Sequence, residues 1–117
     1  MRESQLQIAV ASYLDRALML GACWFHVPNE GKRSCVTGRN LKRQGLKKGV
    51  PDCVIIYRGR AYFIELKTAK GRLQPEQKDF ADVLEMCGAG FKVCRSLNEV
   101  QEALYSWGIP LKARIIA

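Results

Sequence analysis

The stretch GVPDCVIIYRGRAYFIELK, residues 49–67, decides the fold. It holds two apolar runs rich in β-branched and aromatic residues, 53–57 and 61–67, separated by Arg58-Gly59. Such runs around two turn residues predict a β-hairpin. Both faces of the two strands are apolar, so helices are expected to cover the sheet on both sides.

The hairpin places two carboxylates together. A turn at Arg58-Gly59 pairs Tyr57 with Arg60, and the same register puts Asp52 opposite Glu65. Opposite residues have Cβ atoms about 4.5–5.5 Å apart. Carboxylates this close repel each other unless a cation or a proton lies between them, and oxygen ligands of this kind suit Mg²⁺ or Mn²⁺.

Lys67 follows Glu65 by two residues, so its side chain leaves the same face of the strand. There it could hold or deprotonate a water molecule that attacks a phosphate. The alternative is a salt-bridged strand end with a solvated lysine, and a slip of one residue in the turn would separate the faces. The apolar strands and the neighbouring basic segment favour a site.

The rest of the chain adds helices and strands around this hairpin, and it contains no internal repeat. The expected elements are a helix over 3–20 ended by Gly21, a strand over 23–27, a basic loop over 29–49, a helix from Pro75 to just before Gly88, a strand over 91–95 and a last helix opened by a Ser96–Glu99 capping box. The order α-β-β-β-α-β-α predicts one α/β domain over residues 1–117, with a mixed sheet of about four strands.

Three apolar stripes at helical spacing are expected to face the core. They contain Leu6, Ala9, Val10, Tyr13, Leu14, Ala17 and Leu18 in the first helix, Phe80, Ala81, Leu84 and Cys87 in the second, and Leu97, Val100, Leu104 and Trp107 in the last. Glu3 and Gln77 stand at the mouths of two of these stripes. Each is either exposed at a helix start or directed into a site.

Residues 29–49 have no sustained period and contain four glycines, which predicts a long basic loop with one helical turn around 39–44. The formal net charge of the chain is +8, which favours nucleic acid first and an acidic membrane surface second as partners. The side chains expected to contact phosphates are Lys32, Arg33, Arg39, Lys42, Arg43, Lys47 and Lys48.

Several classes of protein are disfavoured by composition. No apolar run approaches the ~20 residues of a membrane span, and no signal-peptide pattern opens the chain, so a location in the cytoplasm, or in the cytoplasm of a host, is expected. The first helix lacks the basic polar face of a membrane-surface helix. The five cysteines form no CxxC pair, which argues for reduced, mostly buried thiols rather than disulfides or zinc. His26 is the only histidine, which argues against histidine-based catalysis.

The ordered motifs resemble the PD-(D/E)xK nuclease superfamily and, more narrowly, the VRR-NUC family. They are the GxPD element at 49–52, the ExK element at 65–67, Gln77, Glu3 on the first helix, and Asn29 with Gly31 before the basic loop. The resemblance implies a PD-(D/E)xK nuclease core and hydrolysis of DNA phosphodiesters with Mg²⁺ or Mn²⁺. It implies catalytic roles for Asp52, Glu65, Lys67, Gln77 and Glu3, with Asp52, Glu65 and the Leu66 carbonyl as metal ligands.

Small standalone members of that family resemble Holliday-junction resolvases, which implies branched DNA as substrate and a homodimer. The expected dimer interface is the first helix or the tail over 108–117, which carries Ile109-Pro110-Leu111 and Ile115-Ile116 and to which Trp24 and Trp107 could contribute. The tail could instead pack on its own domain. Other functions also stay open: a DNA-binding module that kept the fold without cleavage, and, with less support, a tRNA-splicing type of nuclease, since those rely on a catalytic histidine.

Overall fold

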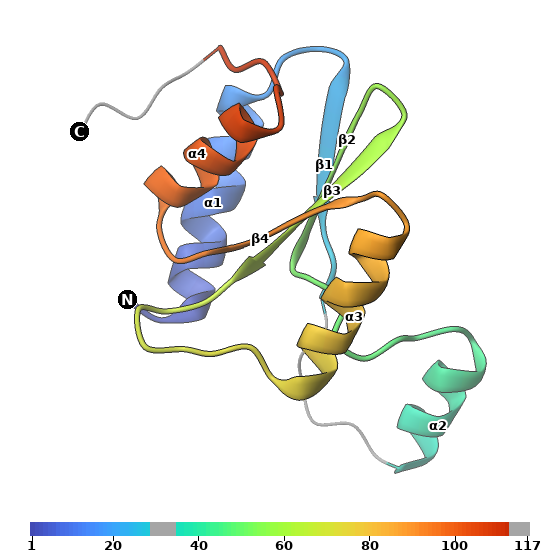
Figure 1. The fold of residues 1–117 in the computed structure, drawn as a ribbon. Helices are drawn as coiled ribbons and strands as arrows, with labels where there is room; N and C mark the ends of the chain where they lie inside the picture. The colour runs from blue at the N-terminus through green and yellow to red at the C-terminus, as the bar shows by residue number, and fades with distance from the viewer. Residues whose placement is uncertain (29–34, 113–117) are drawn as a thin grey trace.

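The computed structural model describes residues 1–28 and 35–112, with the backbone alone for 35–37. Four helices and four strands follow one another in an α/β arrangement (Figure 1). They are α1 (Glu3–Ala17), β1 (Ala22–His26), α2 (Cys35–Arg43), β2 (Cys53–Tyr57), β3 (Arg60–Leu66), α3 (Pro75–Met86), β4 (Gly90–Cys94) and α4 (Leu97–Ser106). The strands form one mixed sheet in the order β1-β2-β3-β4, antiparallel except for the parallel pair β3/β4. The predicted fold class is confirmed.

The β2–β3 hairpin has the predicted turn and register. Arg58 has a φ of 51° and Gly59 a φ of 75°, so both turn residues are left-handed, as a type I′ turn requires. Tyr57 pairs with Arg60, and the ladder continues to Cys53 opposite Ile64. This register brings Asp52 and Glu65 to the same end of the hairpin.

Helices cover both faces of the sheet, as the apolar strands predicted. Helices α1 and α4 lie together on one face, and α3 lies on the other, where it forms the crossover between the parallel strands β3 and β4 (Figure 1). The main core is the apolar layer between the sheet and the α1–α4 pair. Its fully buried residues include Val10, Leu14, Ile55, Ile64, Leu66, Val100 and Leu104.

Helix α1 ends earlier than predicted, where the C-terminal segment packs against it. The helix ends at Ala17 rather than at residue 20, because Leu18 turns extended and pairs with Leu111 in an isolated β-bridge. The N–H of Lys112 donates to the carbonyl of Ala17 at 2.8 Å, which takes up a carbonyl left free at the helix end. Gly21, with a φ of 103°, then begins the path into β1.

The tail is therefore part of its own domain as far as residue 112. Ile109 is fully buried and Leu111 packs against the core. Of the two tryptophans, Trp107 packs on the Tyr62 ring at 5.0 Å between centroids, and Trp24 donates to Asp15 at 2.7 Å. The prediction that Ile109 serves a dimer interface is wrong, because its side chain is buried inside the domain. For the half-buried Leu111, Trp24 and Trp107 it stays a prediction, while Ile115 and Ile116 lie outside the described residues.

The basic segment contains more helix than predicted. Helix α2 spans nine residues, whereas one turn around 39–44 was expected. The full length of α2 was not predicted because Gly38, a weak helix former, lies inside the helix. In addition, nine residues give barely two periods of a helical pattern. Helix α2 lies apart from the sheet, on the far side of α3 from α1 (Figure 1).

The predictions about helix ends and about the cysteines are confirmed only in part. Cys87 is exposed rather than inward, because α3 ends at Met86. Ser96 Oγ accepts from the Glu99 N–H as predicted, while the Glu99 carboxylate accepts from the N–H of Arg95 instead of Ser96. Of the four thiols that the structure describes, Cys53 and Cys94 are buried as predicted, whereas Cys23 and Cys87 are exposed.

Burial raises the pKa of the Cys53 and Cys94 thiols to about 12, so both stay protonated and unreactive. Within residues 1–28 and 35–112, every helix is too short or too polar to span a bilayer.

Candidate active site

Asp52 is fixed at the entrance of β2 by backbone hydrogen bonds. Its Oδ2 accepts from the N–H of Leu66 at 2.8 Å, across the hairpin. Its backbone carbonyl accepts from the N–H of Val27 at 2.8 Å and lies 2.9 Å from Nδ1 of His26, which ties β1 to the same point. Pro51 before it is fully buried and restricts the backbone. The carboxylate therefore has little freedom to turn away from Glu65.

Glu65 lies almost opposite Asp52 and is only 3% exposed. Its Oε2 accepts from Nε2 of Gln77 at 3.0 Å and lies 3.6 Å from Nζ of Lys67. Lys67 is itself 7% exposed, so a buried amine faces a buried carboxyl group. The structure thus brings together four residues predicted for the site: Asp52, Glu65, Lys67 and Gln77.

Glu65 is a buried acid with a second carboxyl group beside it, and both features disfavour its ionisation. Burial, followed by repulsion from Asp52, raises the pKa of Glu65 to about 8, and Lys67 opposes this shift. A hydrogen bond with the Asp52 side chain and the charge of Glu3 raise the pKa further. A further positive charge next to Glu65 would lower this pKa and favour the anionic form at neutral pH.

Helix α3 delivers Gln77 through a close contact with the GxPD element. Gly49 has a φ of 83°, and a Cβ at this position would overlap the backbone carbonyl of Glu76 in the first turn of α3. Gln77 also caps the helix, since its Oε1 accepts from the N–H of Gln74 at 2.8 Å. One side chain therefore both caps α3 and holds Glu65.

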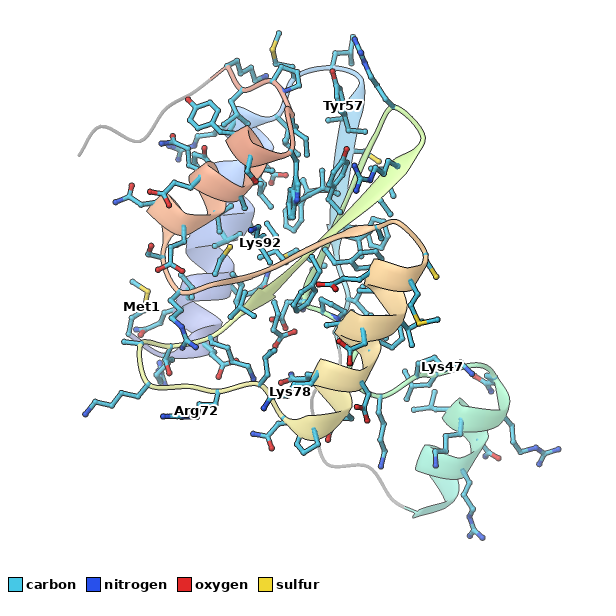
Figure 2. The ribbon with its side chains drawn as sticks, in the orientation of Figure 1. Met1, Lys47, Tyr57, Arg72, Lys78 and Lys92 are labelled. Carbon is cyan, nitrogen blue, oxygen red and sulfur yellow. The ribbon has the colours of Figure 1, made fainter. Side chains whose placement is uncertain are left out.

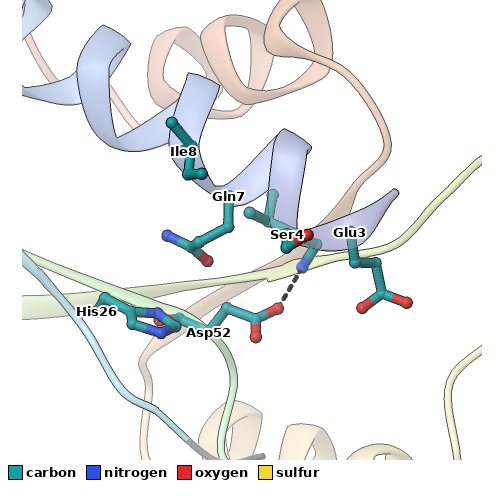
Figure 3. Close-up of a pocket in the computed structure, with 7 residues that line it drawn as sticks. Glu3, Ser4, Gln7, Ile8, His26 and Asp52 are labelled. Carbon is teal, nitrogen blue, oxygen red and sulfur yellow. Dashed lines mark hydrogen bonds between the residues drawn. The ribbon is translucent and has the colours of Figure 1, made fainter. Parts of the chain in front are cut away.

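A pocket opens beside Asp52, under the N-terminal turns of α1 (Figure 3). It is lined by Glu3, Ser4, Gln7, Ile8, His26, Asp52 and Leu66. Glu3 is exposed and stands at the rim with its carboxylate turned toward the Asp52 side, so it is both at a helix start and at the site (Figure 3). Ser4, Gln7 and His26 were missed, because the pairing of β1 with β2 and the placement of α1 over the hairpin leave no signal in sequence spacing.

The predicted basic residues do not enter the carboxylate cluster. Arg39, Lys42 and Arg43 are exposed on α2, and Lys47 and Lys48 are exposed on the segment that leads from α2 to Gly49 (Figure 2 labels Lys47). Lys32 and Arg33 lie outside the described residues. The described cations of this segment lie on the α2 side of the molecule (Figure 1).

Chemically, the arrangement offers two oxygen ligands and an amine around one point. In the part of the chain that the structure describes, no three His, Cys, Asp or Glu side chains are grouped to hold a metal ion. A cation between Asp52 and Glu65 would thus need further oxygen ligands from backbone, water or substrate. Such open coordination is usual where a metal also binds phosphate.

Comparisons with known proteins point to one family. The family model described as "VRR-NUC domain" matches residues 1–98. A solved structure named "VRR_NUC domain protein" superposes with a TM-score of 0.75 at 24% identity, covering 92% of this chain and 88% of the other. A second, named "VRR_NUC domain", gives 0.58 at 22% identity, covering 89% and 94%. No curated protein shows significant sequence similarity to the chain.

Proposed function

The chain belongs to the VRR-NUC domain family, a family of nucleases, and from this premise we propose that it is a divalent-metal-dependent endonuclease that hydrolyses phosphodiester bonds in DNA. The observation that carries the proposal is the convergence of Asp52 and Glu65 beside Lys67. A buried glutamate whose pKa is raised to about 8 by a neighbouring carboxylate is a costly arrangement without a cation.

Mg²⁺ or Mn²⁺ fits the donor set of this site. Both metals prefer oxygen ligands, and Asp52 and Glu65 with the Leu66 carbonyl would hold the ion on one side. When bound, the ion would polarise the phosphate and lower the pKa of a coordinated water molecule. The support for a metal is the pKa of Glu65, which burial and the neighbouring Asp52 raise although the Lys67 amine 3.6 Å away opposes the shift. A cation bound between the two carboxyl groups would stabilise their charged forms.

The chain's own residues have separable tasks in this proposal. The Leu66 N–H and Gln77 Nε2 hold the carboxylates of Asp52 and Glu65 in position. As an ammonium, Lys67 would orient the attacking water or offset the negative charge that develops on the phosphate; as a neutral amine, it would take the proton of that water. Glu3, at the pocket rim, would accept hydrogen bonds from waters that enter beside Asp52.

We further propose branched DNA as the substrate and a homodimer as the active form. A four-way junction presents two symmetry-related strands, and a two-fold dimer holds two sites in fixed relation. Since Ile109 is buried inside the domain, the α1 side is the interface to test. The side chain of Ile8 on α1 is 70% exposed, and that of Leu20, shortly after the end of α1, is fully exposed. These two residues leave apolar surface available on the α1 side.

Cleavage assays on a panel of labelled substrates test the activity. Four-way junction, flap, duplex and single-stranded DNA are incubated with Mg²⁺, with Mn²⁺ or with EDTA. We expect metal-dependent cleavage that is strongest on a branched substrate and is abolished by Asp52→Ala. The exposed Asp82 provides a matched control, Asp82→Ala, which should cleave like wild type.

Two outcomes would overturn this function. Full turnover by purified Asp52→Ala would show that the site is elsewhere. DNA binding by wild type without cleavage of any substrate under either metal would identify a DNA-binding module that kept the fold. Light scattering with and without junction DNA tests the dimer separately, and a monomer mass in both states would rule it out.

A further inference from the structure

A second cluster of cations lies next to the candidate active site, outside the basic segment. The loop that leaves β3 after Lys67 surrounds an open depression lined by Ala69, Lys70, Gly71, Arg72 and Arg95. Three of these five residues are cationic and none carries a carboxylate. Lys70 and Arg72 are exposed, so their charges face solvent rather than a partner in the fold.

The loop is held in shape by Arg95. Its Nη1 donates to the backbone carbonyls of Thr68 at 2.6 Å and Gly71 at 2.5 Å, and the Gly71 N–H closes the turn onto Thr68 at 3.0 Å. Arg95 directly follows β4, so the turn is attached to the sheet. Because the backbone is fixed, the side chains of Lys70 and Arg72 start from defined positions, which lowers the entropic cost of binding an anion.

The loop lies within a few nucleotides of the reacting group. Lys70 is three residues beyond Lys67, so their Cα atoms are at most ~11 Å apart. One strand of duplex DNA advances about 3.4 Å per phosphate along the helix axis. A phosphate bound by this loop would therefore belong to the same stretch of backbone, about three positions or fewer from the phosphate at Lys67.

The loop and α2 lie on different sides of the site. The loop runs from the end of β3, near the N-terminus of α1, to the start of α3, whereas α2 lies beyond α3 (Figure 1). Figure 2 labels Arg72 on this loop and Lys78 in the first turns of α3, which separates the loop from α2. A DNA strand held only by α2 and the 44–49 segment would be anchored on one side of Asp52 and Glu65, and the loop supplies the other side.

We infer that Lys70 and Arg72, on the turn braced by Arg95, form a phosphate-binding subsite that holds the DNA backbone on the side of the active site away from α2. The inference deepens the proposed function and rests on it for the identity of the ligand. The chemistry recognised is a phosphodiester anion, so inorganic phosphate would share the site weakly.

Salt-dependent binding tests the subsite. Binding of a fluorescent duplex is measured by anisotropy in EDTA, so that neither metal nor cleavage enters, for wild type and for Lys70→Ala/Arg72→Ala. The plot of log affinity against log salt should flatten by about 1.8, since each lost phosphate contact changes the slope by about 0.9.

The matched control is Arg16→Ala/Lys112→Ala, which removes the same charge from two exposed positions. Lys112 lies beside Arg16, because its N–H donates to the carbonyl of Ala17. Arg16 is thirteen residues along α1 from Glu3, about 20 Å at the helical rise. This control should keep the wild-type slope. Equal slopes for the two double variants would overturn the subsite, because the effect would then be one of net charge alone.

Neutral methylphosphonate linkages give a second test, in which the wild-type arm removes a charge from the DNA instead of from the protein. Single linkages are placed one to three positions from a mapped cleavage site, on either side. Wild type should lose affinity at one or two positions on one side, and Lys70→Ala/Arg72→Ala should be insensitive there. Inorganic phosphate, compared with chloride at equal ionic strength, should weaken wild type more than the variant.

The two hypotheses fail in different ways. A chain that binds DNA with the expected slopes but cleaves nothing loses the proposed activity and keeps the subsite. A chain that cleaves DNA while no linkage within three positions affects binding, and while both double variants share one slope, keeps the activity and loses the subsite.

Discussion

At Glu65, burial and the neighbouring charge of Asp52 both raise the pKa of the side chain. The side chain is 3% exposed, faces Asp52, and has a pKa raised to about 8, so near neutral pH it holds a proton that an ordinary glutamate would have lost. The amide of Gln77 donates to the same oxygen that Lys67 approaches. Both contacts hold the Glu65 side chain in position. Because its pKa differs between the folded and the unfolded chain, the free energy of unfolding should depend on pH.

We predict that the metal-free protein loses stability as pH rises from about 4.5 to about 8. In this window the unfolded chain has lost the Glu65 proton and the folded chain still holds it, so the free energy of unfolding falls with pH. The loss should be on the order of a few kcal/mol. Urea unfolding across pH should show a flatter profile for Glu65→Gln, while the exposed control Glu85→Gln should follow wild type. Identical profiles for wild type and Glu65→Gln would contradict the assigned shift.

Gln77→Glu separates the two tasks of Gln77. The new glutamate keeps an oxygen that can accept from the Gln74 N–H, but it lacks the amide nitrogen that donates to Glu65. We expect α3 to remain folded by circular dichroism and the cleavage rate to fall by roughly 10–100-fold, the usual cost of losing a group that orients a ligand. Wild-type rates in this variant would mean that the Gln77–Glu65 contact has no part in activity.

At the scale of elements, the approach of α3 to the GxPD segment decides the geometry of the site. Gly49 allows the first turn of α3 to touch the backbone that leads into β2. That contact places Gln77 over Glu65, twelve residues away in sequence. The motif therefore has a packing role besides supplying Asp52.

We predict that Gly49→Ala destabilises the protein by about 1–3 kcal/mol and lowers activity as well. The added Cβ would meet the backbone of Glu76, and the left-handed φ of 83° would be strained. Gly45→Ala is the matched control, since Gly45 has a φ of 106° but no atom within 4 Å of its Cβ position. Denaturation curves should show the larger loss for Gly49→Ala, and equal losses would remove the packing argument.

At the scale of the whole molecule, the cations are spread around the site rather than inside it. Helix α2 and the segment to Gly49 carry exposed lysines and arginines on one side, and the loop at Lys70 and Arg72 carries them on the other. The net charge of +8 is thus arranged to attract a polyanion to the carboxylates.

Replacing Lys42, Arg43, Lys47 and Lys48 together by alanine should weaken DNA binding and flatten its salt dependence by several units. Each phosphate contact contributes about 0.9 to the slope on duplex DNA. Affinity measured from low to high salt checks the prediction, with Arg16→Ala/Lys112→Ala as a control for lost charge. An unchanged slope would mean that DNA follows a different face of the molecule.

The local part of this structure was determined by the sequence. The β2–β3 register, and with it the meeting of Asp52 and Glu65, follows from a two-residue turn and a two-residue alternation, which act between residues close in the chain. The start of α3 at Pro75 has the same local origin.

The tertiary structure decided what lies around that pair. The packing of the helices and the tail on the sheet brings Gln77 to Glu65 and places His26 and Glu3 at the border of the site. It also pairs Leu111 with Leu18. These contacts join distant parts of the chain through burial of apolar surface. That driving force is non-directional, so spacing along the sequence cannot specify which side chains it will bring together.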